Sequence, residues 1–193
     1  MVLLCYFDRQ FNRSDEHTMA YTLLKNALKE LYGTDDKIKT LCYTPLSKPQ
    51  IKDEVFSISH SCGVVGVVIK ADGIFYSSDI ISHKICDKNP HSLGLDIECI
   101  SDKDIAKCKR IAQAKFLKSE QNILFQCVDE TEYIRLFVKI WTTKESYGKY
   151  TGRGLSDALG FDTQSEHADV QFFSDIITVC DNDYYFTVCY NAE

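Results

Sequence analysis

The stretch Trp141-Thr142-Thr143-Lys144-Glu145-Ser146-Tyr147-Gly148-Lys149 combines an apolar helix face with charged side chains. Upstream of it, apolar residues recur at the three- and four-residue steps of one buried helix face: Ile134, Phe137, Val138 and Trp141. Glu145 and Lys149 lie one and two turns beyond Trp141 on the same face. Charged groups are seldom buried unless they are paired or bound to something. The stretch therefore predicts either a helix that carries an acid and a base into a binding site, or an ordinary Glu–Lys pair on a solvated face.

Two other segments carry polar residues of the same kind. Residues 55–61 alternate apolar and polar side chains, which predicts a strand with Ser59-His60-Ser61 at its end. Residues 93–98 predict another strand, and because side chains alternate across a strand, Asp96 and Glu98 point to one face. Each segment also has a plainer interpretation: a histidine satisfied by neighbouring hydroxyls, and a solvated strand face.

The three segments together supply groups that suit a metal ion and a phosphate. These are one imidazole, three carboxylates and two ammonium groups: His60, Asp96, Glu98, Glu145, Lys144 and Lys149. Hard oxygen ligands without dedicated cysteine or histidine ligands favour Mg²⁺, or Mn²⁺ in its place, and Mg²⁺ commonly completes its shell with substrate phosphates. Residue chemistry thus indicates a magnesium-dependent enzyme acting on a diphosphate.

Composition sets broad limits. The chain has 193 residues, 45% of them hydrophobic, which suits one large or two small domains with a full core. A net charge of −6 argues against general nucleic-acid binding. The apolar N-terminus reaches Asp8 and Arg9 too early for a signal peptide, and no apolar run is long enough to span a membrane. The nine cysteines include no closely spaced pair, which predicts small buried hydrophobes in a reducing compartment. We expect a soluble, cytoplasmic protein with no membrane partner.

The three segments resemble the motifs of the 4′-phosphopantetheinyl transferases, specifically the larger surfactin-synthetase-activating type. The family's helix motif, (F/W)-(S/C/T)-x-K-E-(A/S)-x-x-K, matches Trp141 to Lys149 at every specified position. Its (I/V)-G-(I/V)-D motif is similar to Leu93-Gly94-Leu95-Asp96, with leucine at both aliphatic positions. Its Asn-(I/L)-Ser-His-Ser motif is similar to Ser57-Ile58-Ser59-His60-Ser61, with serine in place of asparagine.

The resemblance implies an α+β fold of two similar α/β halves related by a pseudo-twofold axis. The halves are expected at residues 1–92 and 93–193, with coenzyme A and the metal in the cleft between them. The first half would then contribute His60 and the contacts to the coenzyme A phosphates and adenine. The second would contribute the metal-binding acids and the catalytic helix. Since one chain contains both halves, we expect a monomer.

The resemblance also implies an activity and residue roles. The family transfers 4′-phosphopantetheine from coenzyme A to a serine of an apo acyl or peptidyl carrier protein and releases adenosine 3′,5′-bisphosphate. Glu145, Lys149 and His60 are the expected catalytic residues, and Glu145 would take the serine proton directly or through water. The remaining roles follow the family motifs: Asp96, Glu98 and Glu145 bind the metal; Lys144, Lys149 and His60 contact the phosphates; Lys48 lies near the adenine; and Arg13 lies near the 3′-phosphate.

The chain also departs from the family. Between His60 and Gly94 it is longer, and the extra residues, between Lys70 and Ser92, are expected to form an added hairpin, a lid or a disordered loop. Residues 77–92 are polar and predict a loop. For Lys48, a loop lysine in water is an equal alternative.

The partners raise a question of charge. Carrier proteins of the resembled family tend to be acidic, so the basic run at residues 103–118 is a candidate docking face, with an ordinary solvated helix as the alternative. Two other functions remain open: a non-catalytic module that binds coenzyme A or a carrier, and a magnesium-dependent hydrolase of nucleotide diphosphates.

Overall fold

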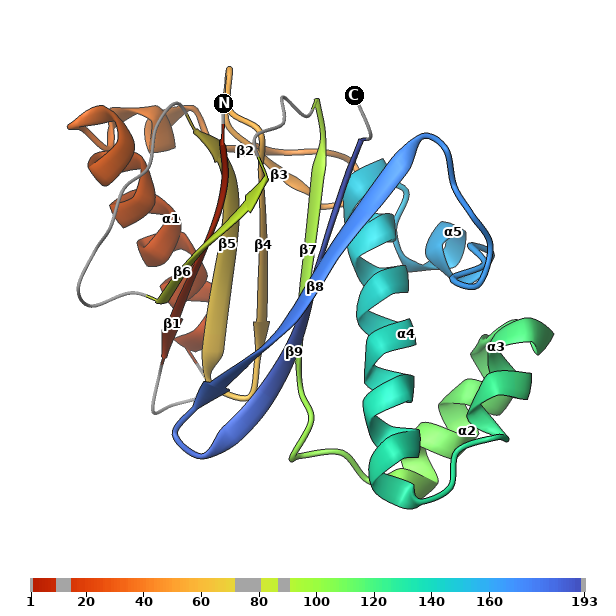
Figure 1. Ribbon diagram of the computed structural model, residues 1–193. Helices are drawn as coiled ribbons and strands as arrows, with labels where there is room; N and C mark the ends of the chain where they lie inside the picture. The colour runs from red at the N-terminus through yellow and green to blue at the C-terminus, as the bar shows by residue number, and fades with distance from the viewer. Residues whose placement is uncertain (1, 10–14, 72–80, 87–90, 192–193) are drawn as a thin grey trace.

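The computed structural model describes residues 2–9, 15–71, 81–86 and 91–191, and two antiparallel sheets with flanking helices dominate this part of the chain (Figure 1). In chain order the elements are β1 (Val2–Arg9), α1 (Glu16–Tyr32), the 3₁₀ helix η2 (Asp36–Thr40), β2 (Cys42–Tyr43), β3 (Pro49–Gln50), β4 (Phe56–Ser61), β5 (Val64–Ala71), β6 (Ile81–Cys86), β7 (Leu93–Cys99), α2 (Ile105–Lys115), α3 (Lys118–Leu124), α4 (Glu130–Thr151), α5 (Leu155–Leu159), β8 (Val170–Val179) and β9 (Asn182–Asn191). The α+β class predicted from the sequence is confirmed.

The first sheet has the strand order β4-β5-β1-β6 and carries α1 on one face (Figure 1). Strand β5 is apolar on both faces because it is buried on both. Val65, Val67 and Ile69 pack against α1, whereas Val64 and Val68 point the other way. Helix α1 ends at Gly33, whose φ of 72° is the left-handed conformation that glycine adopts most easily.

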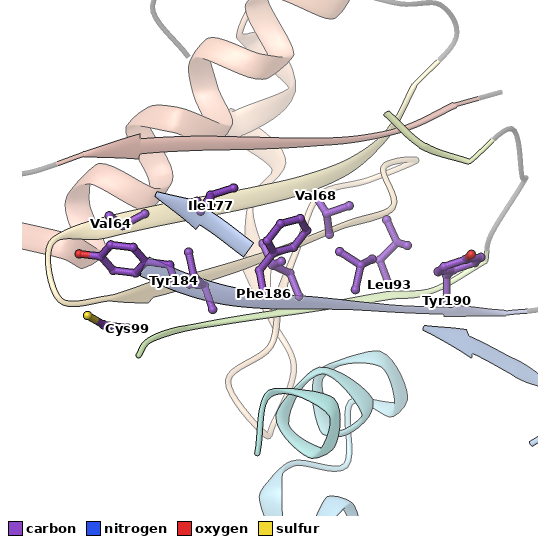
Figure 2. Close-up of a cluster of buried hydrophobic side chains, with 11 residues drawn as sticks. Val64, Val68, Leu93, Cys99, Ile177, Tyr184, Phe186 and Tyr190 are labelled. Atoms are coloured by element: carbon purple, nitrogen blue, oxygen red, sulfur yellow. The ribbon is translucent and has the colours of Figure 1, made fainter. Parts of the chain in front are cut away.

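The second sheet has the order β7-β9-β8 and packs its inner face against the first sheet. Figure 2 shows this shared core, in which Val64 and Val68 of β5 meet Leu93 of β7 and Phe186 of β9. The alternation of β7 sends Leu93, Leu95 and Ile97 into this core and turns Gly94, Asp96 and Glu98 toward α4.

Strands β4 and β7 lie side by side where the two sheets meet (Figure 1). Side chains, rather than a backbone ladder, join them. Each of three alternate serines on β4 accepts a hydrogen bond from an alternate backbone N–H of β7. The pairs are Ser57 with Leu95 (2.9 Å), Ser59 with Ile97 (3.3 Å) and Ser61 with Cys99 (3.2 Å). We call this row of contacts the serine seam.

Helix α4 packs directly on β7 at Gly94. A Cβ added to Gly94 would lie 1.8 Å from the carbonyl oxygen of Ser146, so only glycine allows the helix to approach this closely. Asp129 caps the start of α4 by accepting a hydrogen bond from the N–H of Glu132, and Gly152, with φ of 69°, ends it. The end at Gly152 agrees with the glycines that follow the helix motif.

One strand differs from the sequence-based expectation. The predicted loop at residues 77–92 contains β6, which pairs antiparallel with β1 from Phe7↔Ile81 to Leu3↔Cys86. Strand β6 lies at the edge of its sheet, where a strand needs no continuous apolar run, so its polar sequence does not predict a strand. Residues 72–80 and 87–90, which belong to the same extra segment, lie outside the described residues.

Two further predictions concern the cysteines and the membrane. The seven cysteines whose side chains are described are free thiols. Cys99, Cys108 and Cys189 are buried as expected, whereas Cys42 and Cys180 are exposed, which contradicts the expectation for those two. Among the residues that the structure describes, no helix combines the length and the apolar character needed to cross a membrane.

Candidate active site

A cavity of about 610 Å³ lies over the serine seam, between the start of α1 and the C-terminal half of α4. Five of the predicted site residues line it: His60, Asp96, Glu98, Glu145 and Lys149. They come from β4, β7 and α4, so residues of both expected halves face one space. A neighbouring groove of about 180 Å³ shares Glu145 and Lys149 and adds Lys48.

Asp96 is the most enclosed of the acids, with 6% of its surface exposed. Its Oδ1 accepts hydrogen bonds from Lys149 Nζ (2.8 Å) and Ser59 Oγ (3.0 Å). Its Oδ2 is buried and has no hydrogen-bond partner in the described part of the chain. Burial raises the pKa of Asp96 and the charge of Glu98 adds to this, while Lys149 opposes it. A buried oxygen without a partner is costly, so Oδ2 is a carboxylate oxygen whose bonding capacity is left for a ligand.

Glu145 faces the same cavity from α4 and is half-buried. Burial raises its pKa from the ordinary value of 4.5 to about 7, and the charge of Asp96 contributes in the same direction. Lys149, one turn further along the helix, pulls the pKa of Glu145 down. A carboxylate with a pKa near 7 can accept a proton at neutral pH and give it up again.

Glu98 lies two residues after Asp96 on the same face of β7. It forms an ion pair with Lys103 and accepts a hydrogen bond from Ser61 Oγ (3.2 Å). Each of the two acids on β7 therefore has a lysine partner, Lys149 for Asp96 and Lys103 for Glu98. Neither the motifs nor the periodicity of the sequence predicts the pairing of Glu98 with Lys103.

The donor set fits a hard divalent cation. No three histidine, cysteine, aspartate or glutamate side chains among the described residues are gathered tightly enough to form a ready-made metal cage. Mg²⁺ does not need one, because it keeps several waters and usually takes one or two carboxylates plus substrate phosphates. Asp96, Glu98 and Glu145 supply only carboxylate oxygens to the cavity, and Oδ2 of Asp96 lacks another partner.

His60 stands exposed at the rim of the cavity. Its Nδ1 lies 2.9 Å from Oε2 of Glu16, at the start of α1, and Oε1 of Glu16 accepts the N–H of Gly63 (2.5 Å). The ring is therefore not satisfied by the neighbouring hydroxyls, because Ser59 and Ser61 bond to β7 instead. Sequence reasoning missed Glu16, which is 44 residues away and is also a typical first-turn acid of a helix.

Lys48 is half-buried rather than free in water, which contradicts the loop-lysine alternative. Its Nζ lies 3.3 Å from the carbonyl oxygen of Leu93 and 3.4 Å from that of Tyr150. Burial lowers the pKa of Lys48. The ammonium group thus sits near the last carbonyls of α4, where a positive charge is stabilising, and also lines the groove beside the cavity.

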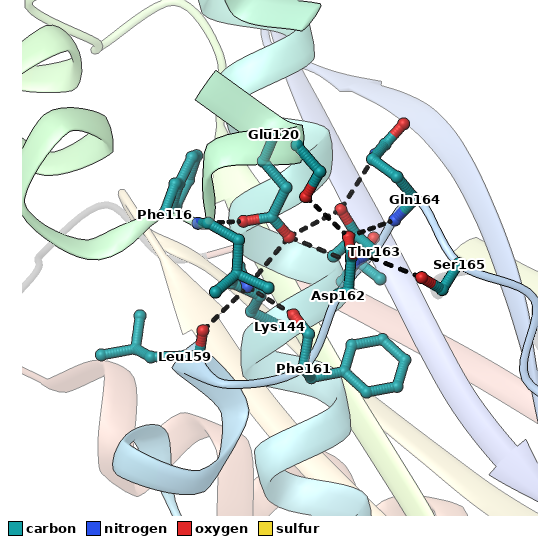
Figure 3. Close-up of polar contacts among 12 residues, drawn as sticks. Phe116, Glu120, Lys144, Leu159, Phe161, Asp162, Thr163, Gln164 and Ser165 are labelled. Atoms are coloured by element: carbon teal, nitrogen blue, oxygen red, sulfur yellow. Dashed lines mark hydrogen bonds and ion pairs between the residues drawn. The ribbon is translucent and has the colours of Figure 1, made fainter. Parts of the chain in front are cut away.

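Lys144 does not reach the cavity, which contradicts its predicted phosphate contact. Its side chain has no exposed surface and forms an ion pair with Oε1 of Glu120 (2.9 Å), as Figure 3 shows. It also donates to the carbonyl oxygens of Leu159 (3.1 Å) and Phe161 (2.5 Å). Glu120 is equally satisfied, since it accepts the N–H and the hydroxyl of Thr163. The pair ties α4 to α3 and to the chain that follows α5.

Arg13, the remaining predicted residue, lies outside the described residues.

Comparison with known proteins agrees with the motifs. The profile of the 4′-phosphopantetheinyl transferase superfamily matches residues 92–189, which is half of the chain. The chain belongs to this superfamily. The match begins at the residue before β7 and takes in β7, α4 and the closing hairpin of β8 and β9, so this transferase-family region contains Asp96, Glu98, Glu145 and Lys149.

The chain is also similar to the 4′-phosphopantetheinyl transferase gsp of Aneurinibacillus migulanus. The two are 35% identical over 79 residues, which make up 39% of this chain and 31% of the relative. The similar region thus spans under a third of the relative's length.

The buried pair predicts that Lys144 acts on stability rather than on ligand binding. Replacing Lys144 by Met leaves the Glu120 carboxylate buried without its partner, so we expect a loss of about 3–5 kcal/mol in the free energy of unfolding, measured in urea. Lys139→Met, on an exposed position of the same helix, is the control and should change little. If Lys144→Met had normal stability but bound coenzyme A more weakly, the result would contradict the structural role and support the phosphate contact predicted from the sequence.

The raised pKa of Glu145 predicts a pH dependence of stability. Between pH 4.5 and about 7 the folded state holds the Glu145 proton and the unfolded state does not. Stability contributed by this group is therefore present at low pH and falls as the pH rises through this window. In chelator, wild type should lose more stability between pH 5 and pH 8 than Glu145→Gln does, by urea unfolding, with exposed Glu130→Gln as the charge control. Equal losses in all three proteins would refute the assignment.

Proposed function

We propose that this chain transfers 4′-phosphopantetheine from coenzyme A to a serine of an apo acyl or peptidyl carrier protein, with Mg²⁺, and releases adenosine 3′,5′-bisphosphate. One observation carries the proposal. In a member of the 4′-phosphopantetheinyl transferase superfamily, three acids, a lysine and a histidine from β4, β7 and α4 line one cavity. The relative from Aneurinibacillus migulanus, by its name, is a 4′-phosphopantetheinyl transferase.

The residues have distinct roles in this reaction. Asp96, Glu98 and Glu145 would hold Mg²⁺, whose charge would polarise the diphosphate and stabilise the leaving bisphosphate. Lys149 and His60 bind the diphosphate oxygens through charge-assisted hydrogen bonds. To do so, Lys149 exchanges its present contact with Asp96 for one with the substrate.

The chemical step moves one proton and one phosphoryl bond. The serine oxygen of the carrier forms a bond to the phosphorus that bears the pantetheine, and the bond from that phosphorus to the bisphosphate oxygen breaks. Glu145 takes the serine proton, directly or through one water, because a hydroxyl is a poor nucleophile until its proton has an acceptor.

The remaining family features extend the proposal. We infer that residues 1–92 and 93–193 are the two related halves of the surfactin-synthetase-activating type, working as a cytoplasmic monomer without nucleic acid or membrane. Lys48, in the groove beside Glu145, is the proposed contact for the adenine end of coenzyme A. Arg13, whose role rests on the family resemblance alone, is the proposed contact for the 3′-phosphate.

The test is intact-protein mass spectrometry of an apo carrier protein incubated with this chain, coenzyme A and Mg²⁺. We expect a mass gain equal to one phosphopantetheine, lost in Glu145→Gln and in chelator. Release of free phosphopantetheine without a carrier would favour a hydrolase instead. Coenzyme A binding with no gain on any of a panel of carriers would favour a binding module.

Helix α2 is the proposed docking face for the carrier. It contains no acidic residue, and Lys107, Lys109, Arg110 and Lys115 are exposed on it. Beside it, Phe125, which is 85% exposed, lines a groove of about 550 Å³ that Lys109 and Lys118 also line. Val128, three residues further along the chain, is 90% exposed. An acidic carrier with an apolar contact residue would match this surface.

Reversing two of these charges should weaken docking alone. We expect Lys107→Glu with Arg110→Glu to raise the KM for an acidic carrier about tenfold, because steering depends on the facing charges, and to leave the KM for coenzyme A unchanged. Lys139→Glu, exposed on α4, is the matched control. A parallel rise in both KM values would rule out α2 as the docking face.

A further inference from the structure

The hydroxyl of Ser59 connects three groups of the candidate site. It donates to Oδ1 of Asp96 (3.0 Å) and accepts from Nζ of Lys149 (2.9 Å) and from the N–H of Ile97 (3.3 Å). Ser59 itself is 5% exposed. It belongs to β4, whereas all three partners belong to the C-terminal part of the chain.

These contacts use the whole capacity of the hydroxyl. A serine hydroxyl has one proton to donate and two lone pairs to accept with. An amide N–H and an ammonium group can only donate, so both occupy the lone pairs and the proton is left for the carboxylate. The arrangement therefore has one consistent assignment of donors and acceptors, and it orients Oδ1 of Asp96 toward β4.

The proposed reaction makes this contact more important. Lys149 and Ser59 are the two groups that hold Oδ1 of Asp96, and Lys149 is the one that would turn to the diphosphate. Ser59 then remains as the fixed partner of Oδ1, while Oδ2 has no protein partner among the described residues. Hydrogen-bonded groups behind a metal ligand commonly set the ligand's orientation and the affinity of the site.

We propose that Ser59 is a positioning residue for the metal site: its hydroxyl, supplied by the N-terminal part of the chain, holds the carboxylate of Asp96 for a divalent cation. This inference rests on the metal-binding role proposed for Asp96. It assigns to Ser59 a role beyond joining the strands, and a comparison with Ser57 shows the difference. Ser57 accepts a hydrogen bond from the N–H of Leu95 in the same seam, but within the described part of the chain it forms no hydrogen bond with a site acid.

The seam thus contains its own control. Ser57→Ala and Ser59→Ala each remove one hydrogen bond from a β4 hydroxyl to a β7 amide, and only Ser59→Ala also removes the contact with Asp96. Mn²⁺ binding is measured by electron paramagnetic resonance on the whole chain without coenzyme A or carrier, beside the thermal midpoint of each variant.

We expect Ser59→Ala to weaken Mn²⁺ binding by about 10- to 100-fold, the range typical of lost partners behind metal ligands. Ser57→Ala should bind Mn²⁺ as wild type does while showing a similar fall in thermal midpoint. Ser59→Thr keeps the hydroxyl and should restore most of the affinity. If Ser59→Ala does not fold, Ser59→Cys makes the same comparison, because a thiol is only a weak donor.

Equal weakening in Ser57→Ala and Ser59→Ala would overturn the proposal, because the loss would then come from the seam as a whole. No Mn²⁺ binding by the wild type would overturn it as well. The transfer assay separates this inference from the proposed function. If the wild type transfers phosphopantetheine and Ser59→Ala binds Mn²⁺ normally, only the positioning role of Ser59 is rejected. If Ser59→Ala alone binds Mn²⁺ weakly and the wild type transfers nothing, the proposed transferase activity is rejected and the positioning role of Ser59 stands.

Discussion

The rest of the structure depends on the row of hydrogen bonds between β4 hydroxyls and β7 amides. Two sheet edges that met through their backbones would fuse into one continuous sheet and leave no space between α1 and α4. Serine side chains satisfy alternate amides of β7 instead, at about 1 kcal/mol of net stability for each bond, and keep the strands a side chain apart. The cavity lies over this gap, so the serines both join the two strands and leave the space that forms the site.

Helix α4 carries two lysines whose side chains point in different directions. Lys149 points into the cavity and pairs with Asp96, whereas Lys144 points away from it and pairs with Glu120 in a fully buried contact. A step of one residue rotates a side chain by about 100° around a helix, so the neighbours Lys144 and Glu145 cannot share a face. The buried pair fixes how α4 is rotated, and that rotation aims Glu145 and Lys149 at β7.

Much of the site was predictable, because periodic patterns place side chains on faces. Alternation along β7 put Asp96 and Glu98 together, and helical spacing put Glu145 and Lys149 together. The pairing of His60 with Glu16, and of Glu98 with Lys103, depends on how separate elements meet, which local patterns do not contain. The motif likewise predicted a phosphate contact for Lys144, whereas its partner in the structure is Glu120, which lies on α3. Strand β6 escaped prediction because its residues alternate too weakly at a sheet edge.

The serine seam also has a mechanical consequence. Parting two strands of a backbone ladder breaks a row of hydrogen bonds between main-chain atoms, whereas each bond of the seam ends on a serine hydroxyl that can turn about one torsion angle. Weakly bonded regions are the first to yield in a folded protein. The seam can therefore adjust its spacing without breaking a ladder of either sheet, while the apolar core that the two sheets share limits how far they part.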